Sequence, residues 1–199
     1  MKKTLYLMRH GQTLFNLRRK MQGHCDSPLT PLGIKQAEIA GEYFENIDID
    51  HAYSSTSERC CDTLELATKG KMPYVRLKGL KEMNFGVFEA ESEDLKPQDK
   101  KDYENFFLQY GGEAMSQVKE RMLKTCTEIM EREDHNTVLA VSHGLASLCF
   151  LSNFQDTYEL MMAGVPNCII FKYEYENKEF KLVDVIRHDF SQIEEALAY

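Results

Sequence analysis

The chain opens with TLYLMRHG (Thr4–Gly11), an apolar run that ends in an arginine, a histidine and a glycine. A continuous apolar run is typical of a strand that is covered on both faces, as in a parallel sheet. A second stretch, TVLAVSHG (Thr137–Gly144), has the same form. If the two strands are parallel neighbours, His10 and His143 reach the same edge of the sheet, where α/β folds bind ligands. The pattern alone leaves open whether the two histidines are functional or structural.

Helical patterns alternate with strand patterns along the rest of the chain. Thr30 and Pro31 mark the start of a helix, and residues 56–67 and 114–132 have helical spacing. Short strands are expected at 51–55 and, as a hairpin, at 168–175 and 180–186. The inward-facing side of the first helix is predicted to carry Ile34, Ala37, Gly41 and Phe44. We therefore expect an α/β fold: a three-layer α/β/α sandwich with a mostly parallel central sheet and an antiparallel C-terminal hairpin.

Composition restricts the class of protein further. The 199 residues fit one domain, 1–199, and the net charge of −8 argues against a non-specific nucleic-acid binder. The apolar run at the N-terminus is too short for a secretory signal, and no run approaches a membrane span. The six cysteines form no disulfide-type framework, so we expect reduced thiols in a cytoplasmic protein.

One segment departs from the alternating pattern. Residues 89–104 hold seven acidic residues and three lysines, and FFLQYGGEA follows soon after. We interpret residues 89–112 as an exposed, acidic and partly helical insertion that overhangs the functional site.

Arg59 is a third candidate residue. It falls in the first turn of a predicted helix, where a cation opposes the helix dipole, so it is either a surface arginine or part of an anion site. The histidines and cysteines show no zinc-ligand spacing, and no glycine-rich nucleotide motif is present, so no metal and no cofactor is predicted. A phosphoryl group held by arginine and histidine side chains is the simplest ligand for this set, and histidine can itself act as the nucleophile.

Six stretches of the chain then match a known pattern. LMRHGQTLFN, MQGHCDSPLTPLGIKQA, YSSTSERCCDT, LKEMNFGVFEA, YGGEA and AVSHG resemble, in this order, the successive signatures of the histidine phosphatase superfamily. The resemblance is to the phosphoglycerate-mutase-like branch and runs from residue 4 to about residue 186.

The resemblance implies a role for each candidate residue. His10 would be the nucleophile that becomes phosphohistidine, and Glu82 the group that protonates the leaving oxygen and then activates water. Arg9, Arg59 and His143 would hold the phosphate. Substrate-binding positions would be Asn16, Gln22, Gly23 and Gly144.

Two activities share this chemistry. A mutase of this family needs extra cations for a second anionic group, whereas the segment from Met83 to Gly112 contains no arginine. We therefore expect hydrolysis of a small phosphorylated metabolite, with phosphoglycerate mutase as the alternative, particularly if Lys96, Lys100 and Lys101 fold inward. A phospho-ligand binder without turnover is the third hypothesis. A homodimer cannot be inferred from the sequence.

Overall fold

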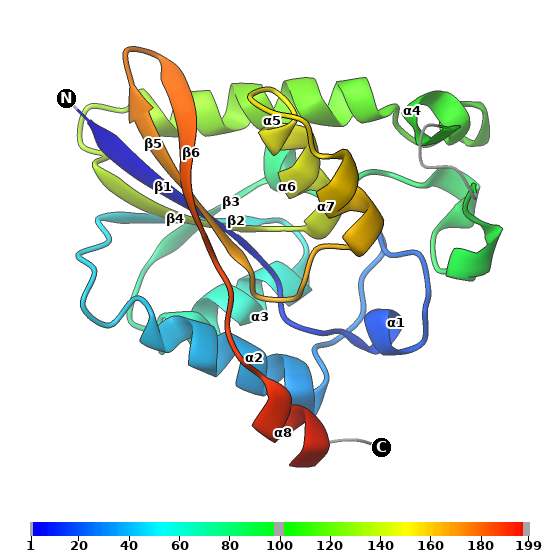
Figure 1. Cartoon of the computed structure of the whole chain (residues 1–199), viewed down its shortest axis with the longest axis horizontal. Coiled ribbons are helices and arrows are strands. Elements are labelled where there is room, and N and C mark those ends of the chain that lie inside the picture. The colour runs from blue at the N-terminus through cyan, green and yellow to red at the C-terminus, as the bar shows by residue number, and fades with distance from the viewer. Residues whose placement is uncertain (1, 98–101, 197–199) are drawn as a thin grey trace.

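A single six-stranded sheet forms the centre of the computed structural model, which describes residues 2–97 and 102–196 (Figure 1). The strand order is β3-β2-β4-β1-β5-β6. The pairs β1·β4, β2·β4 and β2·β3 are parallel, whereas β5 pairs antiparallel with both β1 and β6. The strands are β1 (Lys3–Arg9), β2 (His51–Ser55), β3 (Tyr74–Leu77), β4 (Thr137–Ser142), β5 (Ile170–Glu176) and β6 (Glu179–Ile186).

Helices cover both faces of this sheet. On one face lie α2 (Pro31–Glu42), α3 (Glu58–Ala67) and the terminal α8 (Ser191–Ala196), and on the other lie α5 (Met115–Met130), α6 (Gly144–Leu151) and α7 (Tyr158–Ala163) (Figure 1). Two short helices, α1 (Leu14–Leu17) and α4 (Tyr103–Phe106), lie in the connections. The predicted three-layer sandwich with an antiparallel C-terminal hairpin is confirmed.

The core is split into two clusters because successive residues of a strand point to opposite faces. In β1, Leu5 and Leu7 pack with α5 and α6, whereas Tyr6 and Met8 pack with α2 and α3. All four residues of this run are buried, as the unbroken apolar pattern predicted.

Helix α2 begins as its sequence predicted but is oriented differently. Thr30 caps it by accepting a hydrogen bond from the Gly33 N–H at 3.0 Å, and Pro31 occupies the first turn. The expectation that Ile34 faces the core is wrong, because this side chain is 37% exposed. Gly33 lies on the buried side instead, where its backbone contacts the chain beside Gln12. The small residue permits a close approach that a larger core residue would prevent.

The acidic stretch and the residues just before it, 85–112 together, form short helical turns at 86–88, 93–95 and 108–110, in addition to α4. Their aromatic side chains pack with one another and with α5; these include Phe85, Phe88, Phe106 and Phe107. Lys100 and Lys101 lie outside the described residues. Within the described ranges no helix is both long enough and apolar enough to cross a bilayer.

The close contact between Gly33 and the Gln12 backbone can be tested with Gly33→Ala. A Cβ at this position would lie 2.0 Å from the Gln12 carbonyl oxygen, so the segment after His10 must shift. Alanine favours a helix by about 1 kcal/mol relative to glycine, yet overpacking costs about 1–3 kcal/mol. We expect the clash to dominate and to lower the free energy of unfolding in urea by about 1–2 kcal/mol.

Lys35→Ala, on the exposed side of the same helix, is the matched control and should change stability by less than about 0.5 kcal/mol. A Gly33→Ala protein as stable as the wild type would show that the two backbones are not in tight contact.

Candidate active site

The parallel register of β1 and β4 brings the two His-Gly stretches together. Arg9 pairs with Ser142, so His10 and His143 leave the sheet side by side. Their ring centroids are 5.3 Å apart, and the rings meet edge to face at 69°. This placement follows from the topology alone, because both strands end at the same edge.

Arg59 joins this edge to the neighbouring loop. Its side chain is fully buried, and its guanidinium makes five hydrogen bonds within the protein. Nη1 donates to the Cys25 carbonyl at 2.9 Å and to Asp26 Oδ1 at 2.8 Å. Nη2 donates to the Gly23 carbonyl and to His143 Nδ1, both at 2.9 Å, and Nε approaches His10 Nε2 at 3.3 Å. The sequence left open a surface position for this arginine, and the structure excludes it.

The hydrogen bonds assign the tautomer of His10. Nδ1 lies 2.8 Å from the Gly11 carbonyl oxygen, which only accepts, so Nδ1 carries the proton and Nε2 keeps its lone pair. Burial, followed by the positive charges of Arg59 and Arg9, lowers the pKa of His10 well below its ordinary value. His10 is therefore a neutral imidazole near pH 7, with a lone pair on Nε2.

His143 is the opposite tautomer to His10. Because its Nδ1 accepts from Arg59, its Nε2 carries the proton and donates to Ser55 Oγ at 2.8 Å. Burial and the charge of Arg59 also lower the pKa of His143 well below the ordinary value. Neither His143 nor Arg59 lines the cavity described below; both lie in the layer behind His10.

Arg9 is the site residue with an unused donor. Its Nη1 donates to the Val165 carbonyl, whereas its buried Nε has no hydrogen-bond partner among the described residues. Buried donors are rarely left unpaired, and a missing ligand is one cause. A Cβ at Gly144 would lie 3.4 Å from this nitrogen, so the glycine leaves room beside it.

Glu82 lines the cavity described below and is held at the start of α6. Oε1 accepts the N–H groups of Met83 at 3.0 Å and Ala146 at 2.8 Å, and Oε2 accepts that of Leu145 at 3.0 Å. The Glu82 carbonyl in turn accepts from Arg121 at 2.9 Å. Backbone and carboxylate are therefore both fixed, and Oε2 accepts one N–H group where Oε1 accepts two.

The remaining predicted positions lie in or beside the loop after α1. Asn16 and Gln22 line the cavity, and Gln22 is oriented by Thr13 at 2.6 Å and Ser27 at 3.1 Å. Gly23 does not line it; its carbonyl binds Arg59 instead. A Cβ on Gly23 would lie 2.1 Å from the Met83 carbonyl, which explains the absence of a side chain.

Glu89 is a residue that the sequence interpretation missed. We expected it on an exposed acidic insertion, but it is half-buried and accepts four backbone N–H groups. The donors are Gly23 at 3.1 Å, His24 at 2.8 Å, Cys25 at 3.0 Å and Phe85 at 3.0 Å. These bonds outweigh the cost of burial and lower the pKa of Glu89. The carboxylate therefore holds the loop whose carbonyls bind Arg59.

A cavity of about 520 Å³ lies at the carboxyl ends of β1 and β4. Its lining includes Arg9, His10, Asn16, Gln22, Glu82 and Gly144. Part of the acidic stretch lines the mouth of this cavity, where Arg19 pairs with Asp94 at 2.8 Å and Lys96 with Glu93 at 2.7 Å. Cationic side chains at the mouth are thus matched by carboxylates. Other lining groups include Lys20, Phe85 and Tyr103.

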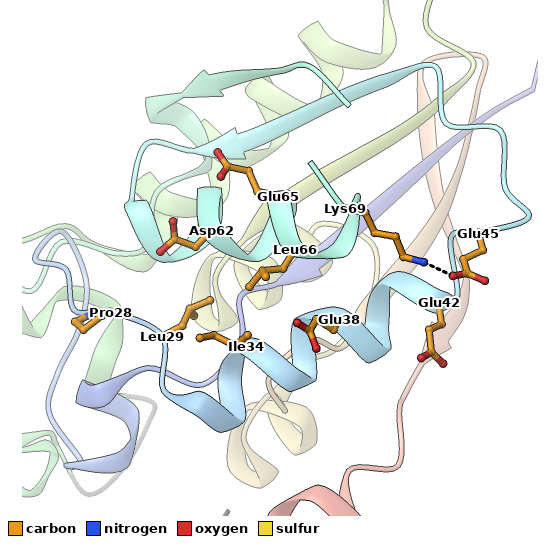
Figure 2. Close-up of a pocket in the computed structure, with 10 residues that line it drawn as sticks. All are labelled: Pro28, Leu29, Ile34, Glu38, Glu42, Glu45, Asp62, Glu65, Leu66 and Lys69. Carbon is orange, nitrogen blue, oxygen red and sulfur yellow. Dashed lines mark hydrogen bonds and ion pairs between the residues drawn. The ribbon is translucent and has the colours of Figure 1, made fainter. Parts of the chain in front are cut away.

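A second, larger hollow of about 800 Å³ lies elsewhere, between α2 and α3 (Figure 2). Ile34, Leu66 and Leu29 lie at its base, and carboxylates such as Glu38 and Asp62 surround it. It contains none of the residues described above, and its acidic rim would repel a phosphate. The smaller cavity is therefore the candidate site.

Comparison with known proteins identifies the chain as a phosphoryl-transfer enzyme. The sequence model of the histidine phosphatase superfamily (branch 1) matches residues 5–187, and the chain belongs to this superfamily. A probable phosphoglycerate mutase, GpmB, of Proteus mirabilis (strain HI4320) is 31% identical over 183 residues, which cover 87% of this chain and 85% of the relative.

Solved structures agree in fold. Bacillus stearothermophilus YhfR is 30% identical with a TM-score of 0.79, covering 90% of this chain and 95% of that one. A phosphoserine phosphatase from Entamoeba histolytica, in complex with 3-phosphoglyceric acid, has a TM-score of 0.80 at 23% identity, covering 94% and 98%. The latter likeness concerns the fold alone.

Glu89→Gln tests the carboxylate that holds residues 23–25. Glutamine keeps the shape, but its NH₂ group faces N–H donors and cannot accept from them. Because hydrogen bonds to a charged group contribute about 1.5–3 kcal/mol, we expect a loss of about 2 kcal/mol in the free energy of unfolding. Amide hydrogen exchange at Gly23, His24 and Cys25 should accelerate more than exchange in the core strands.

Glu91→Gln, an exposed neighbour, is the control and should change neither quantity appreciably. Unchanged exchange at residues 23–25 in Glu89→Gln would show that other contacts hold the loop.

Proposed function

We propose that the protein hydrolyses small phosphomonoesters through a phosphohistidine formed at Nε2 of His10. The observation that carries the proposal is a neutral His10 whose Nε2 lone pair accepts only a long contact from Arg59 Nε, at 3.3 Å, next to a buried Arg9 Nε that has no partner within the described structure. A phosphate oxygen would satisfy that donor while the phosphorus faces the imidazole. The cavity volume suits a metabolite rather than a macromolecule.

In the first step, His10 Nε2 attacks phosphorus and the bond to the leaving oxygen breaks. Glu82, protonated at Oε2, gives its proton to that oxygen, so the product leaves as an alcohol. Arg9 binds the developing charge, as does Arg59 once it exchanges one of its protein acceptors for phosphate. Preorganised contacts of this kind typically contribute about 3–4 kcal/mol each to transition-state stabilisation.

In the second step, water attacks the phosphohistidine. Glu82, now a carboxylate, accepts the proton from the water, phosphate leaves and His10 is restored. His143 acts behind this centre, because its bond from Arg59 keeps the guanidinium turned toward His10. Asn16 and Gln22 bind the substrate from the wall of the cavity, with Gly144 leaving space for it and Gly23 orienting Arg59.

The balanced charges at the mouth favour hydrolysis over a mutase reaction. A mutase must hold a second anionic group, yet Arg19 and Lys96 are already paired with Asp94 and Glu93. Two points favour the mutase alternative: Lys20 lines the same cavity, and the Proteus relative is named a probable phosphoglycerate mutase. We also propose a reducing, cytoplasmic location, which the six free cysteines support.

His10→Ala tests the nucleophile. Turnover of an aryl phosphate should fall by roughly 10⁴-fold or more, and the ³²P-labelled, acid-labile phosphoprotein trapped by rapid quenching should disappear. His51→Gln, at the opposite edge of the sheet, should retain both signals. Label that persists in His10→Ala would place the phosphoryl group on another residue.

A second experiment distinguishes the two activities. Incubation with 3-phosphoglycerate, with and without 2,3-bisphosphoglycerate, should release inorganic phosphate faster than it produces 2-phosphoglycerate. Breaking the mouth pair with Glu93→Gln frees Lys96 and should increase the share of isomerisation. Rapid isomerisation by the wild type with little free phosphate would reverse the assignment.

A further inference from the structure

A second group of chemistry-bearing side chains lies at the edge of the sheet opposite to the candidate site. His51 opens β2, and Asp134 and His135 lie just before β4. Because β2 and β4 are parallel and His51 pairs with Val138, all three residues meet at the amino ends of the strands. His51 lies four positions before Ser55, the hydrogen-bond partner of His143, a distance of about 13 Å along β2.

The side chains of this group converge on one carboxylate. Asp134 Oδ1 lies 2.8 Å from His135 Nδ1, and Asp134 Oδ2 lies 3.2 Å from His51 Nε2. One ligand atom from each residue lies within 4.8 Å of the others. The two imidazole rings are stacked, with centroids 3.7 Å apart.

His135 is held at both ring nitrogens, and its Nδ1 donates to Asp134 Oδ1 at 2.8 Å, so a metal ion would take the place of that proton. Its ring is buried, and its Nε2 lies 2.6 Å from the Tyr53 hydroxyl, which orients the ring and leaves Nδ1 toward Asp134. A hydrogen bond on the second ring nitrogen is the common support of an imidazole ligand.

The backbone that carries this pair is also fixed. Asp50 Oδ2 accepts the N–H groups of Asn136 at 2.7 Å and Thr137 at 3.0 Å, directly after His135. Asp50 also precedes His51, so one carboxylate sets the spacing between the two histidine-bearing segments. The group is therefore held by the fold rather than being a chance meeting of long surface side chains.

We propose that His51, Asp134 and His135 bind one divalent transition-metal ion of the zinc type, which links the start of β2 to the segment before β4. The site is separate from the phosphoryl-transfer chemistry and does not depend on it.

The three side chains need only a small adjustment to bind one ion. In a four-coordinate zinc site with bonds of about 2.0–2.1 Å, ligand atoms lie about 3.4 Å apart. The His–Asp separations are already close to this value. The stacked rings cannot both point at one ion, so the His51 ring must rotate; its side chain is 34% exposed and free enough to do so. Asp134, 71% exposed, leaves the fourth position to water.

The types of ligand predict which metal ions the site prefers. Two imidazoles and one carboxylate suit Zn²⁺, Cu²⁺ and Ni²⁺, whereas Mg²⁺ and Ca²⁺ prefer oxygen ligands throughout. Three ligands, two of them partly exposed, form a weaker site than four thiolates, and the guanidinium of Arg132, 5.8 Å from the Tyr53 ring centre, opposes a further positive charge nearby. We expect a dissociation constant for zinc of about 1–50 µM.

The test uses the whole protein, stripped with EDTA and titrated with ZnCl₂ by calorimetry in a non-coordinating buffer. One ion should bind per chain, MgCl₂ should give no signal, and Co²⁺ should give visible d–d absorption typical of tetrahedral N/O ligands. Zinc at about 100 times the dissociation constant should raise Tm by about 5–10 °C.

His51→Gln and Asp134→Asn should each weaken zinc binding at least tenfold and remove the Tm shift, while aryl phosphatase activity stays unchanged. Both side chains are partly exposed, so neither variant should prevent folding. The matched control is His24→Gln. This histidine lies 3.9 Å from Glu113, outside the proposed site, so the variant should bind zinc as the wild type does. Equal zinc affinity in wild type, His51→Gln and Asp134→Asn, or loss of binding in Cys25→Ser instead, would overturn the proposal.

Discussion

The buried guanidinium of Arg59 is the interaction on which the candidate site depends. A charged side chain with no exposed surface is tolerated only when its donors are satisfied, and here all of its hydrogen bonds go to protein atoms. Those acceptors belong to the end of β1, the residue after β4 and the loop before α2. One side chain therefore fixes three segments that are distant in the sequence.

Carboxylates hold the segments around the buried Arg59 in place. Asp26 neutralises part of the Arg59 charge, Glu89 holds the loop that contains Gly23, and Glu82 binds the first turn of α6. In each case the carboxylate accepts N–H groups of a neighbouring segment and so stabilises its position. The net acidity of the chain thus includes groups that support the phosphate pocket rather than repel its ligand. Asp26 and Glu89 do not line the cavity, whereas Glu82 lines it and is bound by backbone N–H groups.

Sequence patterns predicted the elements whose causes are local. The cap of α2 by Thr30 is confirmed, and so are the helices predicted within 56–67 and 114–132, which are α3 and α5. Ile34 was placed wrongly, since periodicity alone cannot show that Gly33 allows α2 to contact the Gln12 backbone. Glu89 was interpreted as a surface charge because its four donors come from two other segments.

The order of apolar runs, caps and turn residues in the sequence was sufficient to specify a three-layer α/β fold and to place His10 and His143 at strand ends, since strand burial and helix capping depend on near neighbours in the chain. Tertiary structure alone decided the tautomer of each histidine, the burial of Arg59, the unpaired Arg9 donor and the meeting of His51 with Asp134 and His135. Each of these depends on atoms from segments tens of residues apart, whose distances arise only when the sheet has assembled.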